Sequence, residues 1–243
     1  MVSMRVRSIC PLLFYMPALI TCFAFAETPR NADGKPDFNG YWNLPYTPNM
    51  AKELGELPFS AEGKAAYSKI DTQFDPTGFC LLPGIPRMNN SPFPMRIVQT
   101  ADSIIFLYEY MTTFRAVPLN THEHSKKLEP TFMGESVAWW DQNTLVVDTI
   151  GLNDRTWLDT AGHPHSEALH VTERYQLTDA NHIAYEVTVD DPKMYTKPWS
   201  NHRVIERLKP GDRLMEYSCD ENNKDRDQGH LRPGATVVPF NQR

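Results

Sequence analysis

Short apolar runs separated by turn sequences dominate the chain from residue 96 onward. They are rich in β-branched and aromatic residues, which is the composition of strands. In order, the runs are IVQTA, IIFLYEY, TFRAVPL, SVAWW, TLVVDTIG, ALHVTERYQL, HIAYEVTV, NHRVIERL and LMEYSC. The links between them include D-Q-N and T-D-A-N, which suit tight hairpins. The pattern predicts strands that pair antiparallel with their neighbours in sequence.

No convincing long helix separates these nine runs, so residues 96–243 are expected to form an all-β antiparallel meander that ends in a C-terminal tail. Closing the meander into an up-and-down barrel would remove the exposed edges of the sheet. We therefore predict such a barrel, with an open sandwich as the alternative.

The segment 27–95 has a different character, because it is rich in proline and glycine and shows little periodicity. Proline fixes φ and removes a backbone donor, so the segment is predicted to run extended around the core. One short helix is expected from Ser60 to Lys69, where Ser60 can cap the N-terminus and Ala65 and Ala66 favour helix.

The first 26 residues have the features of a cleavable signal peptide. Arg5 and Arg7 are followed by an apolar stretch at 11–23 and by the small-x-small sequence Ala24-Phe25-Ala26. The apolar stretch is too short to span a membrane, and no later stretch approaches the needed length. We expect a periplasmic or secreted protein without a membrane span.

Cysteine count and charge narrow the possible functions. Cys80 and Cys219 remain after the signal peptide, and an even count in an oxidising compartment favours one disulfide between them over a catalytic thiol. The net charge of −6, without a cluster of Lys and Arg, argues against a nucleic-acid partner. The expected partner is a small molecule.

The segment 148–175 concentrates the candidate chemistry in what should be a long polar loop between two strands. His165 and His170 are candidate acid/base groups, oriented by Asp154 or Asp159. Alternatively, a divalent metal such as zinc would be held by the three imidazoles of this segment, namely His163, His165 and His170. The histidines could also brace the loop by bonding to backbone carbonyls.

A second loop, at 190–199, should lie at the same end of the meander, two strands away. There Tyr195 and Trp199, together with Trp157, would contact a substrate. Charged residues within the strands would be costly unless they were paired or faced a wet cavity. The candidates for such a polar lining are Asp148, Arg174, Glu186, Glu109 and Arg115.

Several segments together resemble a family of exported bacterial proteins of uncharacterised function. They are PDFNGYW, CLLPGIPR, IVQTADSIIFLYE, EPTFMGES, NTLVVDTIGLNDRTWLD, GHPHSEALHVTERY and DDPKMYTKPW. The resemblance covers most of the chain and implies no activity. Separately, Gly40-Tyr41-Trp42 is similar to the G-x-W of lipocalin-like (calycin) barrels, where the tryptophan closes the barrel floor beneath an arginine.

The function expected from these patterns is an enzyme that uses His/Asp proton transfer, without an organic cofactor, on a small, partly apolar substrate in a barrel cavity. A lyase, an isomerase and a hydrolase all fit. The alternatives are a non-catalytic periplasmic carrier of a hydrophobic ligand and a histidine-rich metal-binding protein.

Overall fold

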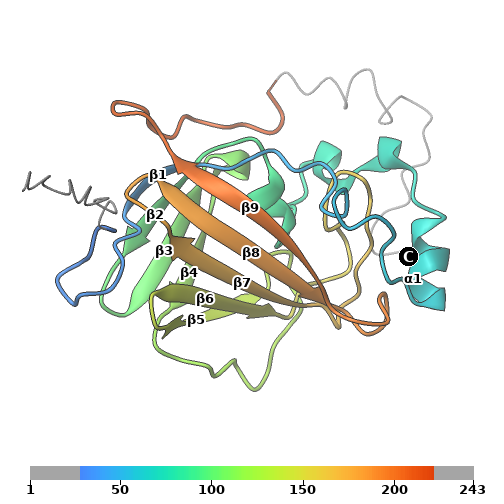
Figure 1. Cartoon of the computed structure of the whole chain (residues 1–243). Helices are drawn as coiled ribbons and strands as arrows, with labels where there is room; N and C mark the ends of the chain where they lie inside the picture. The colour runs from blue at the N-terminus through green and yellow to red at the C-terminus, as the bar shows by residue number, and fades with distance from the viewer. Residues whose placement is uncertain (1–27, 222–243) are drawn as a thin grey trace, which may run out of the picture.

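The structure is a computed structural model that describes residues 28–221. The predicted signal peptide at 1–26 lies outside the described residues. Within them, nine strands form a single sheet that curls into a nearly closed barrel (Figure 1). The strands are β1 Gly40–Asn43, β2 Met95–Gln99, β3 Ser103–Tyr108, β4 Thr113–Pro118, β5 Glu135–Asp141, β6 Thr144–Ile150, β7 His170–Leu177, β8 His182–Asp190 and β9 Trp199–Arg207.

Neighbours in the sheet are also neighbours in sequence, and β1 completes the ring by pairing with both β2 and β9. All these pairs are antiparallel. A ring with an odd number of alternating strands must contain one parallel pair, and that pair is β4 with β5. The two are joined just past β4 by an isolated parallel bridge between Leu119 and Ala138. The predicted antiparallel barrel is confirmed. Between β4 and β5 an isolated bridge takes the place of the longer ladders that join the other strands.

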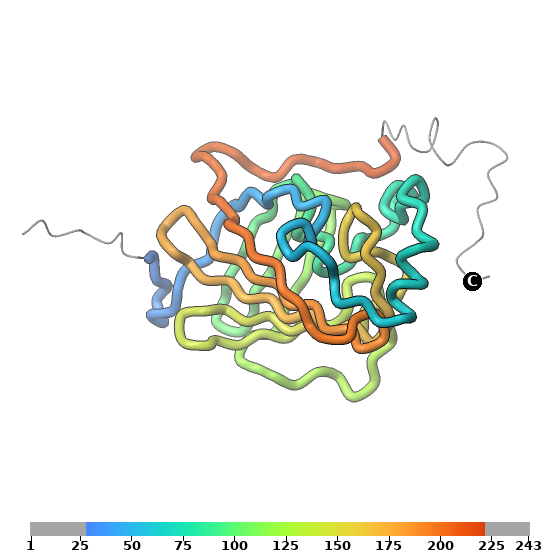
Figure 2. Tube along the Cα trace, turned by 45° about the vertical axis from the view of Figure 1, so that its right-hand side comes forward, coloured from blue at the N-terminus to red at the C-terminus, as the bar shows by residue number. Residues whose placement is uncertain are grey.

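One strand differs from the expected set. Eight of the nine predicted runs form β2 to β9, but LMEYSC at 214–219 does not form a strand. The ninth strand is β1, which comes from the segment predicted to wrap the core. Residues 208–221 instead run back along the outside of the barrel (Figure 2), where Thr112 donates to the carbonyl of Tyr217 and a disulfide joins Cys80 to Cys219. The predicted disulfide is confirmed.

Short helices gather at the end of the barrel where β6 leads to β7 and β8 leads to β9 (Figure 1). They are α1 Ala61–Tyr67 and the 3₁₀-helices η1 Thr72–Phe74, η2 Pro76–Phe79, η3 Arg87–Asn90 and η4 Tyr110–Thr112. Ser60 caps α1 as predicted, because its hydroxyl accepts from the amide of Gly63 at 2.9 Å. Gly63 is required where α1 meets the 190s loop, since a Cβ there would lie 2.0 Å from the carbonyl of Met194.

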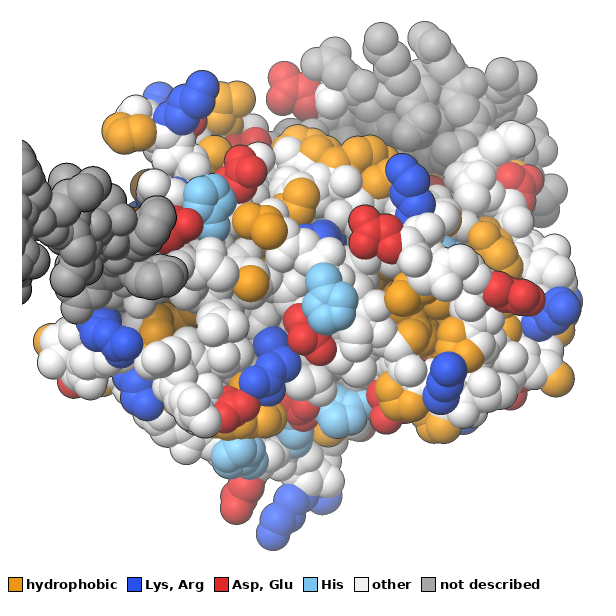
Figure 3. All heavy atoms as spheres, viewed as in Figure 1, with side chains coloured by type: hydrophobic (Ala, Val, Ile, Leu, Met, Phe, Trp, Pro, Cys, Tyr) orange, Lys and Arg blue, Asp and Glu red, His pale blue; other side chains and the backbone are white. Residues whose placement is uncertain are grey.

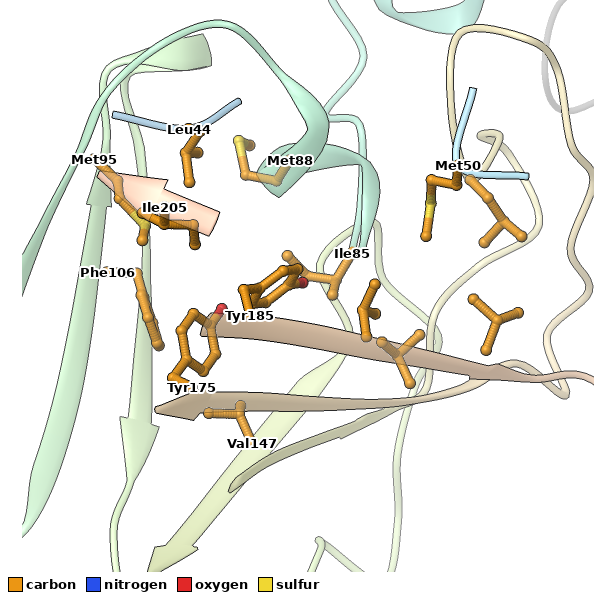
Figure 4. Packing of buried hydrophobic residues seen from close by; sticks show 14 of the residues in the cluster. Leu44, Met50, Ile85, Met88, Met95, Phe106, Val147, Tyr175, Tyr185 and Ile205 are labelled. Carbon is orange, nitrogen blue, oxygen red and sulfur yellow. The ribbon is translucent and has the colours of Figure 1, made fainter. Parts of the chain in front are cut away.

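The barrel interior is filled by side chains of its own walls and by the segment 81–91. Ile85 and Met88 from this segment are buried among the inward-facing residues of the strands. In Figure 4, Ile85 lies beside Tyr185, and Met88 lies on the same side of the aromatic rings. The segment 81–91, hereafter the plug, therefore occupies the interior near the loop-bearing end.

Trp42 lies in the core beneath Arg207, whose guanidinium carbon is 4.2 Å from the centroid of the indole ring. This contact matches the tryptophan–arginine pair expected from the G-x-W sequence. The similarity to lipocalin-like barrels itself stays a prediction. None of the helices within 28–221 is long and apolar enough to cross a membrane.

Candidate functional site

The 151–169 loop and the 191–198 loop meet at one end of the barrel, as the order of the strands predicted. Asp191 joins them, because its carboxylate accepts from the amide of Ser166 at 2.6 Å and from the hydroxyl of Ser166 at 2.9 Å. The phenol of Tyr195 also donates to the carbonyl of Pro164 at 2.9 Å. The two loops thus form one ordered surface.

A cavity of about 640 Å³, hereafter the loop pocket, opens between this surface and the helices η1 and η2. Its lining is mostly polar and includes both acidic and basic groups. The lining residues are Lys69, Ile70, Asp71, Phe74, Pro76, Pro130, Asn153, Asp154, Arg155, Trp157 and Glu167. Two predicted site residues, Asp154 and Trp157, therefore share one cavity.

Directly behind the pocket wall, Thr156 and His165 form a buried hydroxyl–imidazole pair. Nδ1 of His165 lies 3.3 Å from the carbonyl oxygen of Ser166, which can only accept a hydrogen bond, so Nδ1 carries the proton. Burial lowers the pKa of His165, an effect that Asp191 and Asp154 partly oppose, so the ring is neutral at pH 7. Nε2 is then an acceptor, and Thr156 donates to it at 3.2 Å.

His163 and Asp159 form a second pair, which is buried and separate from the first. Nδ1 of His163 lies 2.6 Å from Oδ2 of Asp159, which also accepts from the amide of Met50 at 2.8 Å. The His163 ring stacks on Tyr67, with centroids 5.2 Å apart. This pair joins the 159–163 turn to the N-terminal segment, so His163 braces the loop through a carboxylate and not through a backbone carbonyl as considered above.

His170 lies elsewhere, on the outer face of the barrel. Its Nε2 is 2.6 Å from Oδ1 of Asp148, and Nε2 of His124 is 3.0 Å from the other oxygen of the same carboxylate. Nδ1 of His124 in turn lies 3.3 Å from Glu135. These groups hold the 119–134 loop against β5, β6 and β7.

The expected polar lining of the barrel is therefore corrected. Asp148, Arg174 and Glu186 occupy the outward set of alternate positions on β6, β7 and β8. Figure 3 shows charged and histidine side chains on this outer surface. Of the five candidates, Arg115 of β4 does face inward, where it pairs with Glu173. Alternation defines two sets of positions, but it does not say which set is inside.

Glu173 is the centre of a polar network inside the barrel and is 0 % exposed. Its Oε1 accepts from the side-chain amide of Asn89 at 2.6 Å, from the phenol of Tyr175 at 2.7 Å and from that of Tyr185 at 2.9 Å. Its Oε2 accepts from Arg115. Because Asn89 belongs to the plug, the network fixes the plug to the barrel walls.

Two of the expected substrate contacts are also corrected, since Tyr195 and Trp199 are buried core residues. Their rings pack edge to face with centroids 5.5 Å apart, and Phe59 stacks on Tyr195 at 5.3 Å. They stabilise the 191–198 loop from within, and neither lines the loop pocket. Trp157 alone of the three predicted aromatic groups lines that pocket.

The three imidazoles proposed as zinc ligands point to three different partners. His163 bonds to Asp159, His165 to Thr156, and His170 to Asp148. Within residues 28–221, no group of three or more His, Cys, Asp or Glu side chains is arranged to hold a metal ion. The structure does not bring the predicted ligand set together.

Three functional candidates were not singled out from the sequence. Thr156 and Glu173 look like ordinary loop and strand residues, and only their buried partners reveal them. Arg87 ends the segment CLLPGIPR and is buried, where its guanidinium lies 5.9 Å from the Trp157 ring. An arginine in an apolar, proline-rich segment was the available signal.

The chain matches no known protein-family model and no curated protein.

Proposed function

We propose that this protein is an enzyme that acts on a small polar substrate in the loop pocket by proton transfer, without an organic cofactor. The observation that carries the proposal is the neutral, tautomer-defined His165 behind a wall that presents Asp154 to the pocket. A buried imidazole whose pKa responds to the charge of a pocket carboxylate is typical of acid/base sites.

In this proposal Asp154 is the catalytic residue, because its carboxylate faces the cavity and can take a proton from a bound substrate. His165 is a positioning residue, since it is buried; its ring is neutral at pH 7 and would act on Asp154 electrostatically when it gains a proton at lower pH. Thr156 holds the His165 ring in one orientation. Positioned proton transfer of this kind contributes roughly 10²–10⁴-fold in rate.

The pocket lining indicates the class of substrate. Lys69, Asp71 and Glu167 place charges of both signs around the indole of Trp157. A molecule with several hydroxyl, amine or carboxyl groups and one apolar face would satisfy these groups. A carrier for a hydrophobic ligand would need an apolar hollow along the barrel, where Ile85, Met88 and the core tyrosines are packed.

The test is a screen in which mixtures of hydroxy acids, amino acids and monosaccharides are incubated with the purified protein and followed by NMR. We expect at least one compound to be converted, and Asp154→Asn to lower its kcat by about 100-fold. Glu53→Gln, which changes an exposed carboxylate outside the pocket, is the matched control and should keep full activity. A kcat for Asp154→Asn close to that of the wild type would refute the assignment.

The role of His165 is tested separately, by the pH profile of kcat. His165→Gln keeps a hydrogen-bonding side chain but cannot titrate, so it should move the pH profile of kcat rather than only lower the rate. An unchanged profile together with lowered thermal stability would leave His165 with a purely structural role.

A further inference from the structure

β4 and β5 are neighbours in the ring but are not paired along their length. The strands alternate in direction around the sheet, so these two run parallel, and an isolated bridge between Leu119 and Ala138 joins them. Along β4 itself, Thr113–Pro118, no ladder to β5 is present among the described strands. We call this unpaired stretch between the two strands the seam.

A cavity of about 620 Å³, hereafter the seam groove, lies between β4, β5 and the 119–134 loop. Phe114, Ala116 and Pro118 line it from β4, and Val137 lines it from β5. Most of the remaining lining comes from the loop. The groove therefore runs along an unpaired edge of the sheet.

The groove reaches the main chain of both strands. Arg115 and Ser136 line it as well, although their side chains are buried and bond to Glu173 and Thr149 inside the barrel. A molecule in the groove therefore meets these two residues through main-chain atoms, which are the groups that one strand of a sheet offers to the next.

The main-chain groups along β4 point toward the seam, because hydrogen bonds alternate in an antiparallel ladder. The amide of Leu119 donates to the carbonyl of Asp102 at 2.7 Å, so the odd-numbered residues of β4 bond to β3. The amides and carbonyls of Phe114 and Ala116 consequently face β5. Both residues are exposed, and no ladder or bridge among the described residues uses these groups.

A proline explains why β5 does not close the seam. Pro118 occupies the third seam-facing position of β4 and has no N–H, so the bridge at Leu119 and Ala138 cannot continue along β4 as a ladder. The carbonyl of Ala138 accepts from the amide of Thr121 at 3.1 Å, and Ser136, two residues before it, has the same orientation. Two strand edges thus face each other across the groove.

The side chains around the groove favour a basic, partly apolar partner. Glu123 and Glu129 line it from the loop, and neither carboxylate has a hydrogen bond or ion pair among the described residues. Arg115 is the basic residue of the described lining, but its guanidinium is buried against Glu173. Phe114, which is 65 % exposed, adds an apolar surface. A segment that carries Lys or Arg beside apolar residues matches these groups.

We propose that the seam groove binds an extended, basic peptide segment of another protein, which adds as a strand antiparallel to both β4 and β5. A tenth strand gives the ring an even number of strands, so that every neighbouring pair is antiparallel. Strand addition to an open sheet edge is a general mode of peptide binding. A second copy of this chain fits less well, since it would bring its own Glu123 and Glu129 toward the first pair.

The experiment measures binding of three hexapeptides by isothermal titration, because β4 is six residues long. The first is Lys-Val-Lys-Val-Lys-Val with both ends blocked. The second has glutamate in place of lysine, and the third is the lysine peptide with N-methylated valines, which cannot donate from one edge. We expect the first to bind at one site per chain and the other two at least about tenfold more weakly.

Hydrogen exchange places the bound peptide. The amides of Phe114, Ala116 and Ser136 should exchange more slowly when the lysine peptide is present, because they gain main-chain partners. Equal affinity for the N-methylated peptide, or no binding of the lysine peptide, would overturn the proposal.

Ala116→Pro removes one seam-facing donor without touching the ladder to β3. Proline is tolerated on an edge strand where the N–H faces away from the ladder, so the melting temperature should stay close to that of the wild type. The affinity for the lysine peptide should fall by about fivefold or more. An unchanged affinity would contradict strand addition at β4.

The charge requirement has a matched pair of variants. Glu123→Gln combined with Glu129→Gln should weaken binding of the lysine peptide by about fivefold at low salt. Glu53→Gln combined with Glu56→Gln makes the same change of charge at exposed positions outside the groove, and should leave the affinity unchanged. Equal losses in the two double variants would mean that net charge, and not the groove, attracts the peptide.

Two further results would assign the seam differently. If the peptide affinity is lost in Trp157→Ala and kept in Ala116→Pro, the peptide occupies the loop pocket and the proposal is wrong. If the protein alone forms a dimer by sedimentation and Ala116→Pro abolishes it, a second copy occupies the seam instead. Neither result depends on whether the protein is an enzyme.

Discussion

Two carboxylates on the adjacent strands β6 and β7 have similar partners and opposite surroundings. Glu173 points into the barrel and accepts four hydrogen bonds, one of them from a guanidinium. Asp148 points outward and accepts from two imidazoles and the hydroxyl of Thr172. The inner group joins the plug to the walls of the barrel. The outer group joins the 119–134 loop to the outer face of β6 and β7.

The inner network shifts the pKa values of its members so that Arg115 stays charged and the phenols of Tyr175 and Tyr185 stay protonated. Burial by itself would lower the pKa of Arg115, but the negative charge of Glu173 outweighs it, so the pKa is raised and the guanidinium stays charged. Burial raises the pKa of Tyr175 and Tyr185, and the nearby carboxylate raises it further, so both phenols keep their protons as donors.

The outer group responds to pH. The hydrogen bond that His170 donates to Asp148 raises the pKa of His170, and burial only partly opposes this. Burial alone would raise the pKa of Asp148, but hydrogen bonds from His170 and His124 outweigh it and lower the pKa. Because His170 is 45 % exposed, solvent screens much of the interaction.

The largest effect is expected from breaking the inner network. Glu173→Ala leaves Arg115 buried without its counter-charge and removes the acceptor for Asn89 of the plug. We expect the free energy of unfolding to fall by about 3–5 kcal/mol, measured by chemical denaturation. Glu186→Ala, on the outer face, is the matched control and should change it by less than about 0.5 kcal/mol.

A double replacement separates the cost of the unpaired charge from the cost of the lost hydrogen-bond network. Glu173→Leu combined with Arg115→Met removes both charges and keeps similar volume, so the part of the loss that comes from the unpaired guanidinium should return, while the donors of Asn89, Tyr175 and Tyr185 stay without an acceptor. If the double variant is as unstable as Glu173→Ala, the geometry of the network, and not the unpaired charge, carries the cost.

A smaller, pH-dependent effect is expected from the outer pair. Since the pKa of His170 is raised in the folded state, its contribution is complete below the unfolded value of about 6.5 and is lost as the pH rises through the folded value. The stability difference between the wild type and His170→Gln should be at most about 1 kcal/mol and should shrink between roughly pH 6 and 8. A difference that stays constant over this range would show that the two groups do not interact as a charge pair.

The smallest effect is expected at Arg174, which lies on the same outer face of β7 as His170, two outward-facing positions further along the strand. Its ion pair with Asp141 is solvent-exposed on both sides. Arg174→Ala should change the free energy of unfolding by less than about 0.5 kcal/mol, with the difference vanishing at high salt. A larger loss would mean that the outer face contributes to closure of the sheet.

The loop end was predictable in part. The concentration of His, Asp and Trp at 148–175 identified the region, and the loop pocket does contain Asp154 and Trp157. The partner of each histidine could not be predicted. Each contact depends on how distant segments of the chain pack together or on which groups are buried. His163, for example, contacts Asp159 within its own turn but stacks on Tyr67 from α1.

The β architecture, the capped helix after Ser60 and the disulfide could be predicted from the residues alone, since each depends on local propensity or on the number of cysteines present. The face of β7 that lies inside was not evident, because Val171, Glu173 and Tyr175 include a charged residue, while the alternate positions His170, Thr172 and Arg174 are all polar. Tertiary structure decided this. A carboxylate can be buried only where donors gather around it, and the donors for Glu173 come from the plug and from β4 as well as from β7 and β8.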